Sequence, residues 1–483
     1  MTAHTARTLR TRAAWLPRAW LTLPHERISL GDARLRPGWL VLSLGLVVAA
    51  CFLPRAIINS DEYYYAGQAY VLAQGRILPQ LGDPLPLPEV TPAEAFRYPV
   101  TWPALLSLAR LISFRAMYAF AFLVHLLGAV AVMRMLVRRG AHASLVAFYV
   151  FHPALLVYSR TLMSDVPAVA ALMIAMDAWE NGTVPLSAAG LGLASGMRFA
   201  TASALLGFGL ATQHEWRRRP LGALVLALGV GLFLTVQAVT NQVLAGSAVS
   251  SPYVAAAPDL FGTRMLFENF GLYLAGLALL PPFPLIVALT GPEKVDRWTL
   301  LAAIVVLGAL PISFHNVSTS LLETLVGGQR YVLPAHAAML ISTARVWSRW
   351  LPSVRRSWAV AGAVAMGIVG CLAMSRLEDR YRNATEQLAS CGRGRVAYNY
   401  HAHRIAGSVE ASQYFMLSDE HAAAAMPWDA LVLAPSPQSN QPGYGGGWDS
   451  APPHIDGARC VRVGAYAIYD RSGHCSLHGE ACD

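Results

Sequence analysis

The sequence predicts an all-α membrane protein with about eleven transmembrane helices and a small α/β domain at its C-terminal end. Of the 483 residues, 55% are hydrophobic and only 13% are charged, and the mean hydropathy is +0.42. So few charged residues cannot provide the surface of a water-soluble protein of this length. From residue 376 onward the composition changes to that of a segment in contact with water.

The net charge of +9 raises the question of a nucleic-acid partner. The arginines, however, gather in short segments between apolar runs, where they typically set the orientation of membrane spans. We therefore expect membrane lipids, and no nucleic acid, as partners.

The first 37 residues form a basic segment that we expect in the cytoplasm. Its arginines are Arg7, Arg10, Arg12, Arg18, Arg27, Arg34 and Arg36. The first apolar run begins only near Trp39 and continues without a break, which is too late for a cleaved signal peptide. This run is expected to remain as the first membrane span.

Eleven apolar runs are candidate spans, since a helix needs roughly 20 apolar residues to cross a bilayer. A single helix over residues 186–213 would place the arginines at 217–219 outside, so we divide it at Arg198. The alternative of one long helix remains open. The expected spans cover residues 39–54, 116–137, 143–158, 163–180, 186–197, 199–213, 221–243, 265–289, 299–316, 331–347 and 358–375.

Eleven spans place the C-terminal tail on the outer side, together with a long first loop over residues 55–115. Residues 62–74 and 102–112 of this loop are expected to form amphipathic interfacial helices around a proline-rich link. We assign residues 38–375 to the transmembrane domain and 376–483 to an extracytoplasmic domain. That domain contains strand-like pieces at 395–400, 430–433 and 460–469.

Four of the six cysteines lie in the tail. An even number of cysteines in an oxidising compartment predicts two disulfides, whose pairing the sequence leaves open. The four are Cys391, Cys460, Cys475 and Cys482.

Asp61 and Glu62 follow directly after the first span. A carboxylate at this position is suited to take a proton from a hydroxyl group that attacks a substrate. Asn59 and Asp61 are equally good helix N-cap residues, and Glu62 suits a first turn. Both interpretations can hold together, and we take Asp61 as the candidate catalytic base.

Asp165 begins the fourth predicted span, five residues after Arg160. The pair is suited to hold a phosphate and to orient a sugar or an acceptor. A helix cap and a local ion pair explain the same residues, and we leave this choice open.

Arg330 and Tyr331 stand at the outer start of the tenth span, on the side where basic residues are disfavoured. An arginine at this position favours an anionic ligand, such as a phosphate carried by a membrane lipid, although its side chain could also extend toward lipid headgroups. In the first loop, Arg97, Tyr98 and Tyr64 are further candidate substrate contacts.

Together these motifs resemble the GT-C class of membrane glycosyltransferases, especially bacterial enzymes similar to protein mannosyltransferases and to the lipid A aminoarabinose transferase. The matching pieces, in order over residues 38–350, are Asp61-Glu62, His152-Pro153, Ser159-Arg160, Ser164 to Pro167 and Arg330 to Pro334.

The resemblance implies a polyprenyl-phosphate sugar donor, transfer on the outer face of the membrane with inversion at the anomeric carbon, and Asp61 as the base. Arg330, with Arg160, would receive the phosphate. Members of this class differ in whether a divalent metal lies near the acidic pair, and the sequence fits either case.

We therefore expect a multi-pass glycosyltransferase of a bacterial inner membrane that acts on a lipid, glycan or protein acceptor of the cell envelope. A transporter or flippase of lipid-linked sugars is the alternative. Transporters, however, tend to place ionisable groups near the middle of the bilayer. A structural partner that has lost activity is a third alternative.

Overall fold

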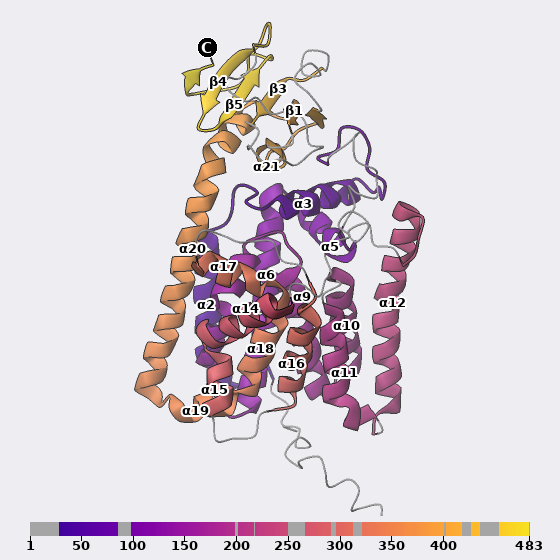
Figure 1. Cartoon of the computed structure of the whole chain (residues 1–483), viewed down its shortest axis with the longest axis vertical. Coiled ribbons are helices and arrows are strands. Elements are labelled where there is room, and N and C mark those ends of the chain that lie inside the picture. The colour runs from indigo at the N-terminus through magenta and orange to yellow at the C-terminus, as the bar shows by residue number, and fades with distance from the viewer. Residues whose placement is uncertain are drawn as a thin grey trace, which may run out of the picture.

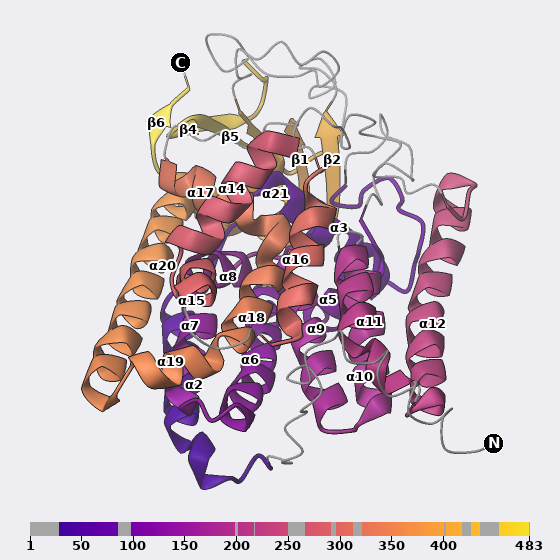
Figure 2. The same ribbon diagram turned by 60° about the horizontal axis from the view of Figure 1, so that its bottom comes forward.

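The computed structural model describes residues 29–85, 98–198, 201–216, 218–249, 266–290, 296–312, 321–399, 402–417, 427–434 and 454–482. It consists of a large helical region with a six-stranded sheet at one end (Figure 1). We call this the sheet end, and the other the opposite end. Helices α20 and α12 lie on opposite flanks of the helical region, and Figure 2 shows the same arrangement after rotation.

The first half of the helical region begins with a short 3-10 helix and continues to α12. Its elements are η3 (Ala33–Leu35), α2 (Arg36–Cys51), α3 (Ser60–Ala73), α5 (Thr101–Arg110), α6 (Phe114–Arg138), η4 (Ala143–Val146), α7 (Ala147–Val150), α8 (Pro153–Ser159), α9 (Asp165–Glu180), α10 (Val184–Met197), α11 (Ala202–Trp216) and α12 (Pro220–Ala245).

The second half ends in α20, a helix of 38 residues that continues without a break from the opposite end to the sheet. Its elements are α14 (Leu266–Leu279), α15 (Pro284–Thr290), α16 (Trp298–Ala309), α17 (Leu321–Gly328), η8 (Gln329–Val332), α18 (Leu333–Ser342), α19 (Ala344–Trp350) and α20 (Ser353–Ser390).

Within the described residues, four helical stretches are long and apolar enough to cross a membrane, or up to five if the bent pair α14 and α15 is one span. The four stretches are Ala33–Cys51, Phe114–Arg138, Pro220–Leu244 and Ser353–Asp379. The predicted multi-pass helical class is confirmed, whereas the predicted number of eleven spans is not.

Prolines explain part of the difference between the eleven predicted spans and the four or five that the described residues show. The predicted span at 143–158 is divided into η4, α7 and α8, and Pro153 occupies the first position of α8. Proline has no N–H for the helical ladder, so it begins a helix rather than continuing one. Helices α14 and α15 are bent by 77° at a break that contains Pro281 and Pro282.

The first loop contains the two predicted interfacial helices, α3 and α5. Helix α3 lies between the helical region and the sheet (Figure 1). On the sheet side, the hydroxyl groups of Tyr63 and Tyr398 are hydrogen-bonded, and the rings of Tyr63 and His403 are 5.0 Å apart. Most of the proline-rich link, including Arg97, lies outside the described residues.

The sheet has the strand order β2-β1-β3-β5-β4-β6. Strand β1 pairs in parallel with β2 and β3, while β3–β5, β5–β4 and β4–β6 are antiparallel. The elements are β1 (Arg395–Asn399), α21 (His403–Ala406), β2 (Gln413–Leu417), β3 (Ala430–Leu433), β4 (Arg459–Val463), β5 (Tyr466–Asp470) and β6 (Glu480–Ala481). The small C-terminal sheet predicted from the sequence is confirmed.

Two disulfides hold this part of the chain together, as the cysteine count predicted. Cys391, at the end of α20, pairs with Cys475, and Cys460 in β4 pairs with Cys482. The first bond joins the long helix to the loop after β5. The predicted strand piece at 460–469 is the β4–β5 hairpin, which turns at Gly464 with a φ of 61°.

Candidate active site

Arg330 brings together two carboxylates from distant parts of the chain. Its Nη2 lies 2.9 Å from Oδ2 of Asp61, and its Nε lies 3.0 Å from Oδ1 of Asp165. Arg330 belongs to the short helix η8, while the two aspartates stand in the first turns of α3 and α9. Asp61, Asp165 and Arg330, predicted separately from three motifs, thus form one group.

Asp61 is the exposed member of this group, with 24% of its side chain accessible. A capping box fixes the start of α3. The Asn59 side chain accepts a hydrogen bond from the Asp61 N–H at 2.9 Å, and Glu62 accepts one from the Asn59 N–H at 3.0 Å. The predicted roles of this segment, as a helix cap and as the source of a catalytic base, are therefore compatible. The cap holds the backbone while the Asp61 carboxylate faces Arg330.

Asp165 is the buried member, and its side chain has no accessible surface. Its Oδ1 accepts the hydrogen bond from Arg330 and forms a second, close ion pair with Arg198. Its Oδ2 has no hydrogen-bond partner in the described part of the chain. Unsatisfied buried oxygens are rare in folded proteins, and they indicate a position that a ligand hydroxyl can complete.

Arg198 is the site residue that the sequence analysis missed. It follows α10, and its guanidinium lies 5.0 Å from the centre of the Tyr331 ring. The Arg330 guanidinium lies 5.7 Å from the same ring, so Tyr331 contacts both cations. The signal was present in the sequence, because Arg198, like Arg330, stands between apolar runs at the predicted outer face.

Glu62 is fully buried, and four donors surround its carboxylate. It accepts hydrogen bonds from the N–H groups of Ile58, Asn59 and Leu162 at 3.3, 3.0 and 3.1 Å, and from the Tyr118 hydroxyl at 3.1 Å. Burial raises the pKa of Glu62 to about 7, although these hydrogen bonds act in the opposite direction. Glu62 thus connects α3 to α6 and to the segment before α9, and it positions its neighbour Asp61.

Arg160 lies in a different environment from the one predicted. Its guanidinium is buried and donates hydrogen bonds to the carbonyl oxygens of Phe52 and Cys371, both at 2.9 Å, and to the Ser375 hydroxyl at 3.4 Å. It thereby joins the ends of α2 and α8 to α20. The structure does not bring Arg160 to the Arg330 group, and its phosphate role stays a prediction.

Two of the predicted substrate contacts, Tyr64 and Tyr98, are buried beside the site. The Tyr98 ring stacks on Tyr65 with 4.4 Å between centroids and contacts Tyr64 edge to face at 6.2 Å. The Tyr65 hydroxyl is 2.8 Å from the hydroxyl of Ser164, the residue before Asp165. These rings support the start of α9 from the side of α3.

The residues present do not fit a metal site at this position. The Arg330 guanidinium occupies the place between Asp61 and Asp165 that a divalent cation would need. In the described chain no group of three His, Cys, Asp or Glu side chains is placed to hold a metal ion.

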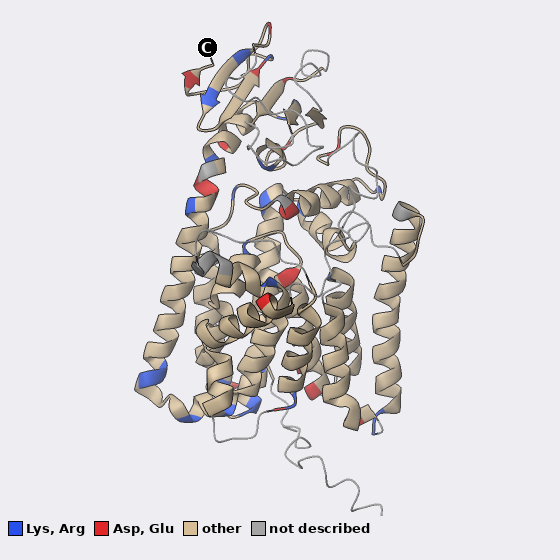
Figure 3. Ribbon diagram, viewed as in Figure 1, with Lys and Arg blue, Asp and Glu red and all other residues tan. Residues whose placement is uncertain are grey.

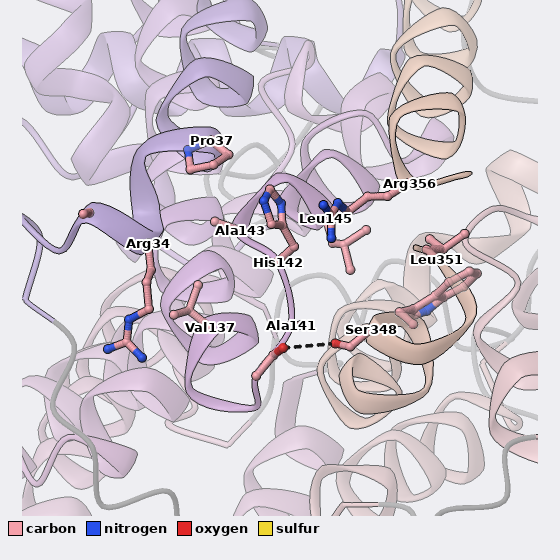
Figure 4. Close-up of a pocket in the computed structure, with 13 residues that line it drawn as sticks. Arg34, Pro37, Val137, Ala141, His142, Ala143, Leu145, Ser348, Leu351 and Arg356 are labelled. Carbon is pink, nitrogen blue, oxygen red and sulfur yellow. Dashed lines mark hydrogen bonds between the residues drawn. The ribbon is translucent and has the colours of Figure 1, made fainter. Parts of the chain in front are cut away.

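A cavity of about 440 Å³ lies at the opposite end of the helical region. Figure 4 shows Arg356, from the start of α20, beside His142 and Leu145 in its wall. Ser348 crosses from α19 to donate a hydrogen bond to the carbonyl oxygen of Gly140 at 3.3 Å. This cavity shares no residue with the Arg330 group, so it is not part of the candidate site.

Comparison of the sequence with models of known protein families and with curated proteins gives no match. The structure, in contrast, is similar to that of ArnT from Cupriavidus metallidurans bound to undecaprenyl phosphate. The TM-score is 0.58 at 13% identity, and the match covers 92% of this chain and 99% of ArnT. The apo state of ArnT gives a TM-score of 0.52 at 14% identity, and that match covers 92% of this chain and 100% of ArnT.

The chain therefore has the fold of ArnT, and the likeness extends over nearly the whole length of both chains. This fold agrees with the GT-C resemblance of the sequence motifs.

Proposed function

We propose that the chain is a membrane glycosyltransferase that moves a sugar from a polyprenyl-phosphate donor to a hydroxyl group of an envelope acceptor. The observation that carries the proposal is the Arg330 group. It places an accessible carboxylate, Asp61, and two arginines in one site of a chain with the ArnT fold.

Arg330 and Arg198 are the groups we assign to the donor phosphate. The two aspartates use Nε and Nη2 of Arg330, so its other Nη remains to donate to a phosphate oxygen. Guanidinium groups suit phosphate because their planar N–H donors match two oxygens at once. The ArnT structure with undecaprenyl phosphate supports a lipid phosphate as the ligand.

Asp61 acts as the general base in this proposal. When phosphate binds Arg330, it competes with Asp61 for the guanidinium, and the carboxylate becomes available to accept a proton. The acceptor oxygen then bonds to the anomeric carbon as the bond from that carbon to the phosphate oxygen breaks. The acceptor proton passes to Asp61, and the electron pair leaves with polyprenyl phosphate.

The leaving group is already a stable anion, so the reaction needs positive charge rather than a general acid. Arg330 and Arg198 supply that charge. Attack opposite the leaving phosphate in a single step inverts the configuration of the sugar. Asp165, buried behind Arg330, orients both arginines, and its unsatisfied Oδ2 is placed to accept a hydrogen bond from a sugar hydroxyl.

For the topology, we propose that the sheet end faces the outside of a bacterial inner membrane. Figure 3 shows basic residues gathered at the opposite end, near the ends of α12, α19 and α20. Cytoplasmic ends of membrane proteins carry this excess of arginine. The two disulfides at the sheet end fit an oxidising compartment.

Asp61→Asn tests the function most directly. We expect it to lower the release of polyprenyl phosphate by roughly 10²- to 10⁴-fold, because it removes the proton acceptor, while donor binding is retained. The measurement uses purified protein in lipid, a panel of polyprenyl-phosphate sugars, and envelope lipids and glycans as acceptors. The matched control is Asp456→Asn, since Asp456 is fully exposed near the sheet.

Normal turnover by Asp61→Asn would remove the base assignment. If no donor in the panel is consumed but the lipid-linked sugars move across liposome membranes, the chain is a flippase and the proposal is wrong.

A further inference from the structure

A second pocket lies at the sheet end, between α20, the start of α6 and the segment before β1. Its volume is about 360 Å³. Besides Glu386 and Glu410, its lining contains four arginines and three residues with hydroxyl groups: Arg55, Arg115, Arg382, Arg393, Ser113, Thr385 and Ser408. We call it the arginine pocket. It shares no residue with the Arg330 group.

The arginine pocket lies at the level where membrane helices end. The apolar stretch of α20 ends at Asp379, three residues before Arg382, and that of α6 begins at Phe114, beside Arg115. Arg55 follows the last residue of α2, Cys51, by four positions. Residues directly beyond the ends of membrane-crossing helices lie among the lipid headgroups.

Positive charge exceeds negative charge in the pocket. Glu410, which also lines it, is held by Arg110 in a bidentate pair at 2.6 and 2.9 Å. Glu386 and Asp379 lie 3.4 and 2.9 Å from Arg55 and Arg382. Within the described part of the chain, Arg115 and Arg393 have no carboxylate at ion-pair distance.

Thr385 gives an independent indication of a ligand. It lines the pocket and is only 5% exposed, yet its hydroxyl has no hydrogen-bond partner among the described residues. A helical threonine normally donates to the carbonyl oxygen one turn earlier, so an unsatisfied buried hydroxyl is unusual. A bound oxyanion would supply the missing partner.

We propose that the arginine pocket binds the phosphate of an anionic phospholipid headgroup, at a site separate from that of the donor. Arginines recognise phosphate through paired N–H donors, and basic pockets between membrane helices are known to hold anionic headgroups. The volume is within the range of small-ligand pockets. This inference does not depend on glycosyl transfer.

Lipid in this pocket would join three parts of the fold. Ser408 receives a hydrogen bond from the Ile57 N–H at 2.8 Å, which attaches the segment leading into α3 to the sheet side of the pocket. Arg382 and Thr385 belong to α20, and Arg115 belongs to α6. A bound headgroup therefore stabilises the folded protein, as any ligand specific for the native state does.

The test compares phosphatidylglycerol, phosphatidylcholine and inorganic phosphate, each added to the full-length protein in detergent. Retained lipid is measured by native mass spectrometry, and the unfolding temperature is measured in parallel. We expect phosphatidylglycerol to be retained and to raise the unfolding temperature more than the other two. Equal stabilisation by inorganic phosphate would replace the lipid site with a free-anion site.

The variant is Arg115→Gln with Arg393→Gln, and the matched control is Arg345→Gln with Arg355→Gln, two exposed arginines near the opposite end. We expect the variant with Arg115→Gln and Arg393→Gln to weaken retention of phosphatidylglycerol by roughly tenfold for each arginine replaced. The control variant should retain the lipid. Equal retention by both would overturn the proposal.

Thr385→Val keeps the shape of the side chain and removes the hydroxyl, so it tests the pocket without removing a charge. The expected result is weaker retention of phosphatidylglycerol with an unchanged unfolding temperature in phosphatidylcholine. Unchanged retention would contradict the role of the hydroxyl group and the proposal with it.

Discussion

The two ends of the helical region each hold a cluster of arginines and carboxylates. The two clusters differ in how far their carboxylates are buried and hydrogen-bonded. At the opposite end, Glu180 is fully buried between α6, α9 and α16. Its carboxylate lies 3.1 Å from Arg138 Nη2 and 2.5 Å from Arg139 Nη2, and it accepts a hydrogen bond from Trp298 at 2.8 Å. We call this the Glu180 network.

The Arg330 group contains similar side chains, but its carboxylates are less fully buried and hydrogen-bonded. Asp61 is 24% exposed, whereas the Glu180 side chain has no accessible surface. Oδ2 of Asp165 has no partner among the described residues, whereas both oxygens of Glu180 are hydrogen-bonded.

We propose that this difference separates a cluster that holds helices together from one that binds a ligand. A buried ion pair is weak evidence for stability, because desolvation offsets much of the attraction. A buried carboxylate with both oxygens satisfied, like that of Glu180, can connect helices and do little else. A cluster that leaves one carboxylate accessible and one oxygen unsatisfied has groups available for a ligand.

The largest expected effect on stability is that of Glu180→Ala. It leaves Arg138 and Arg139 partly uncompensated in a buried position, so we expect a loss of about 3–5 kcal/mol in unfolding free energy. The measurement is unfolding of the purified protein in detergent. Asp165→Asn is the matched change in the Arg330 group, and we expect it to cost less stability and more transfer activity. Equal losses of stability would contradict the distinction between the clusters.

Arg198→Gln comes next in magnitude. Removal of one of the two arginines that we assign to the donor phosphate should weaken binding of polyprenyl phosphate by about 10- to 100-fold, or roughly 1.4–2.7 kcal/mol. Binding of the labelled lipid phosphate measures this effect. The control is Arg219→Gln, since Arg219 lies over the ring of Trp179 at 5.9 Å, at the end of α9 opposite to Asp165. A similar loss in both variants would exclude a specific role for Arg198.

The sequence predicted most of the Arg330 group, because each member is a charged residue at the outer end of a predicted span, where charge is costly unless it is used. Asp61 was selected as a carboxylate after the first span, Asp165 because Arg160 precedes it, and Arg330 because basic residues are disfavoured on that side. Arg198 satisfied the same criterion, but it was used only to divide two spans. The fold class followed from composition and motif order, and the disulfide count followed from the number of tail cysteines.

Other features depend on contacts between distant residues and could not be predicted. Arg160 donates to carbonyl oxygens of Phe52 and Cys371, which are separated from it by 108 and 211 positions. The number of spans depends on where short helices break and bend, which hydropathy does not record. Strand β6 has only two residues, and the sequence of β2 shows no alternation of polar and apolar side chains.

The Arg110–Glu410 pair is a third case, and its carboxylate is the most exposed of the three, because the Glu410 side chain is 39% exposed and that of Arg110 10%. It joins α5 to the segment before β2. Burial alone would raise the pKa of Glu410. The hydrogen bonds and charge of Arg110, together with the Phe114 N–H and the charge of Arg393, outweigh burial and lower the pKa below its ordinary value. An acid with a lowered pKa stabilises the fold above the pKa it has when unfolded, and this contribution is lost as the pH falls.

We therefore expect Glu410→Gln to cost about 0.5–1 kcal/mol at pH 7, a small effect because solvent screens the half-exposed pair. The difference from the wild type should disappear as the pH falls below about 4.5, where the wild-type carboxyl also becomes neutral. Unfolding temperatures at several pH values measure it. Glu386→Gln is the control, because its 3.4 Å contact with Arg55 is between side chains that are half exposed. A difference in unfolding temperature that persists unchanged at low pH would show that packing, rather than charge, gives Glu410 its effect on stability. The burial and hydrogen bonding of the ion pair would then not decide its role at this junction.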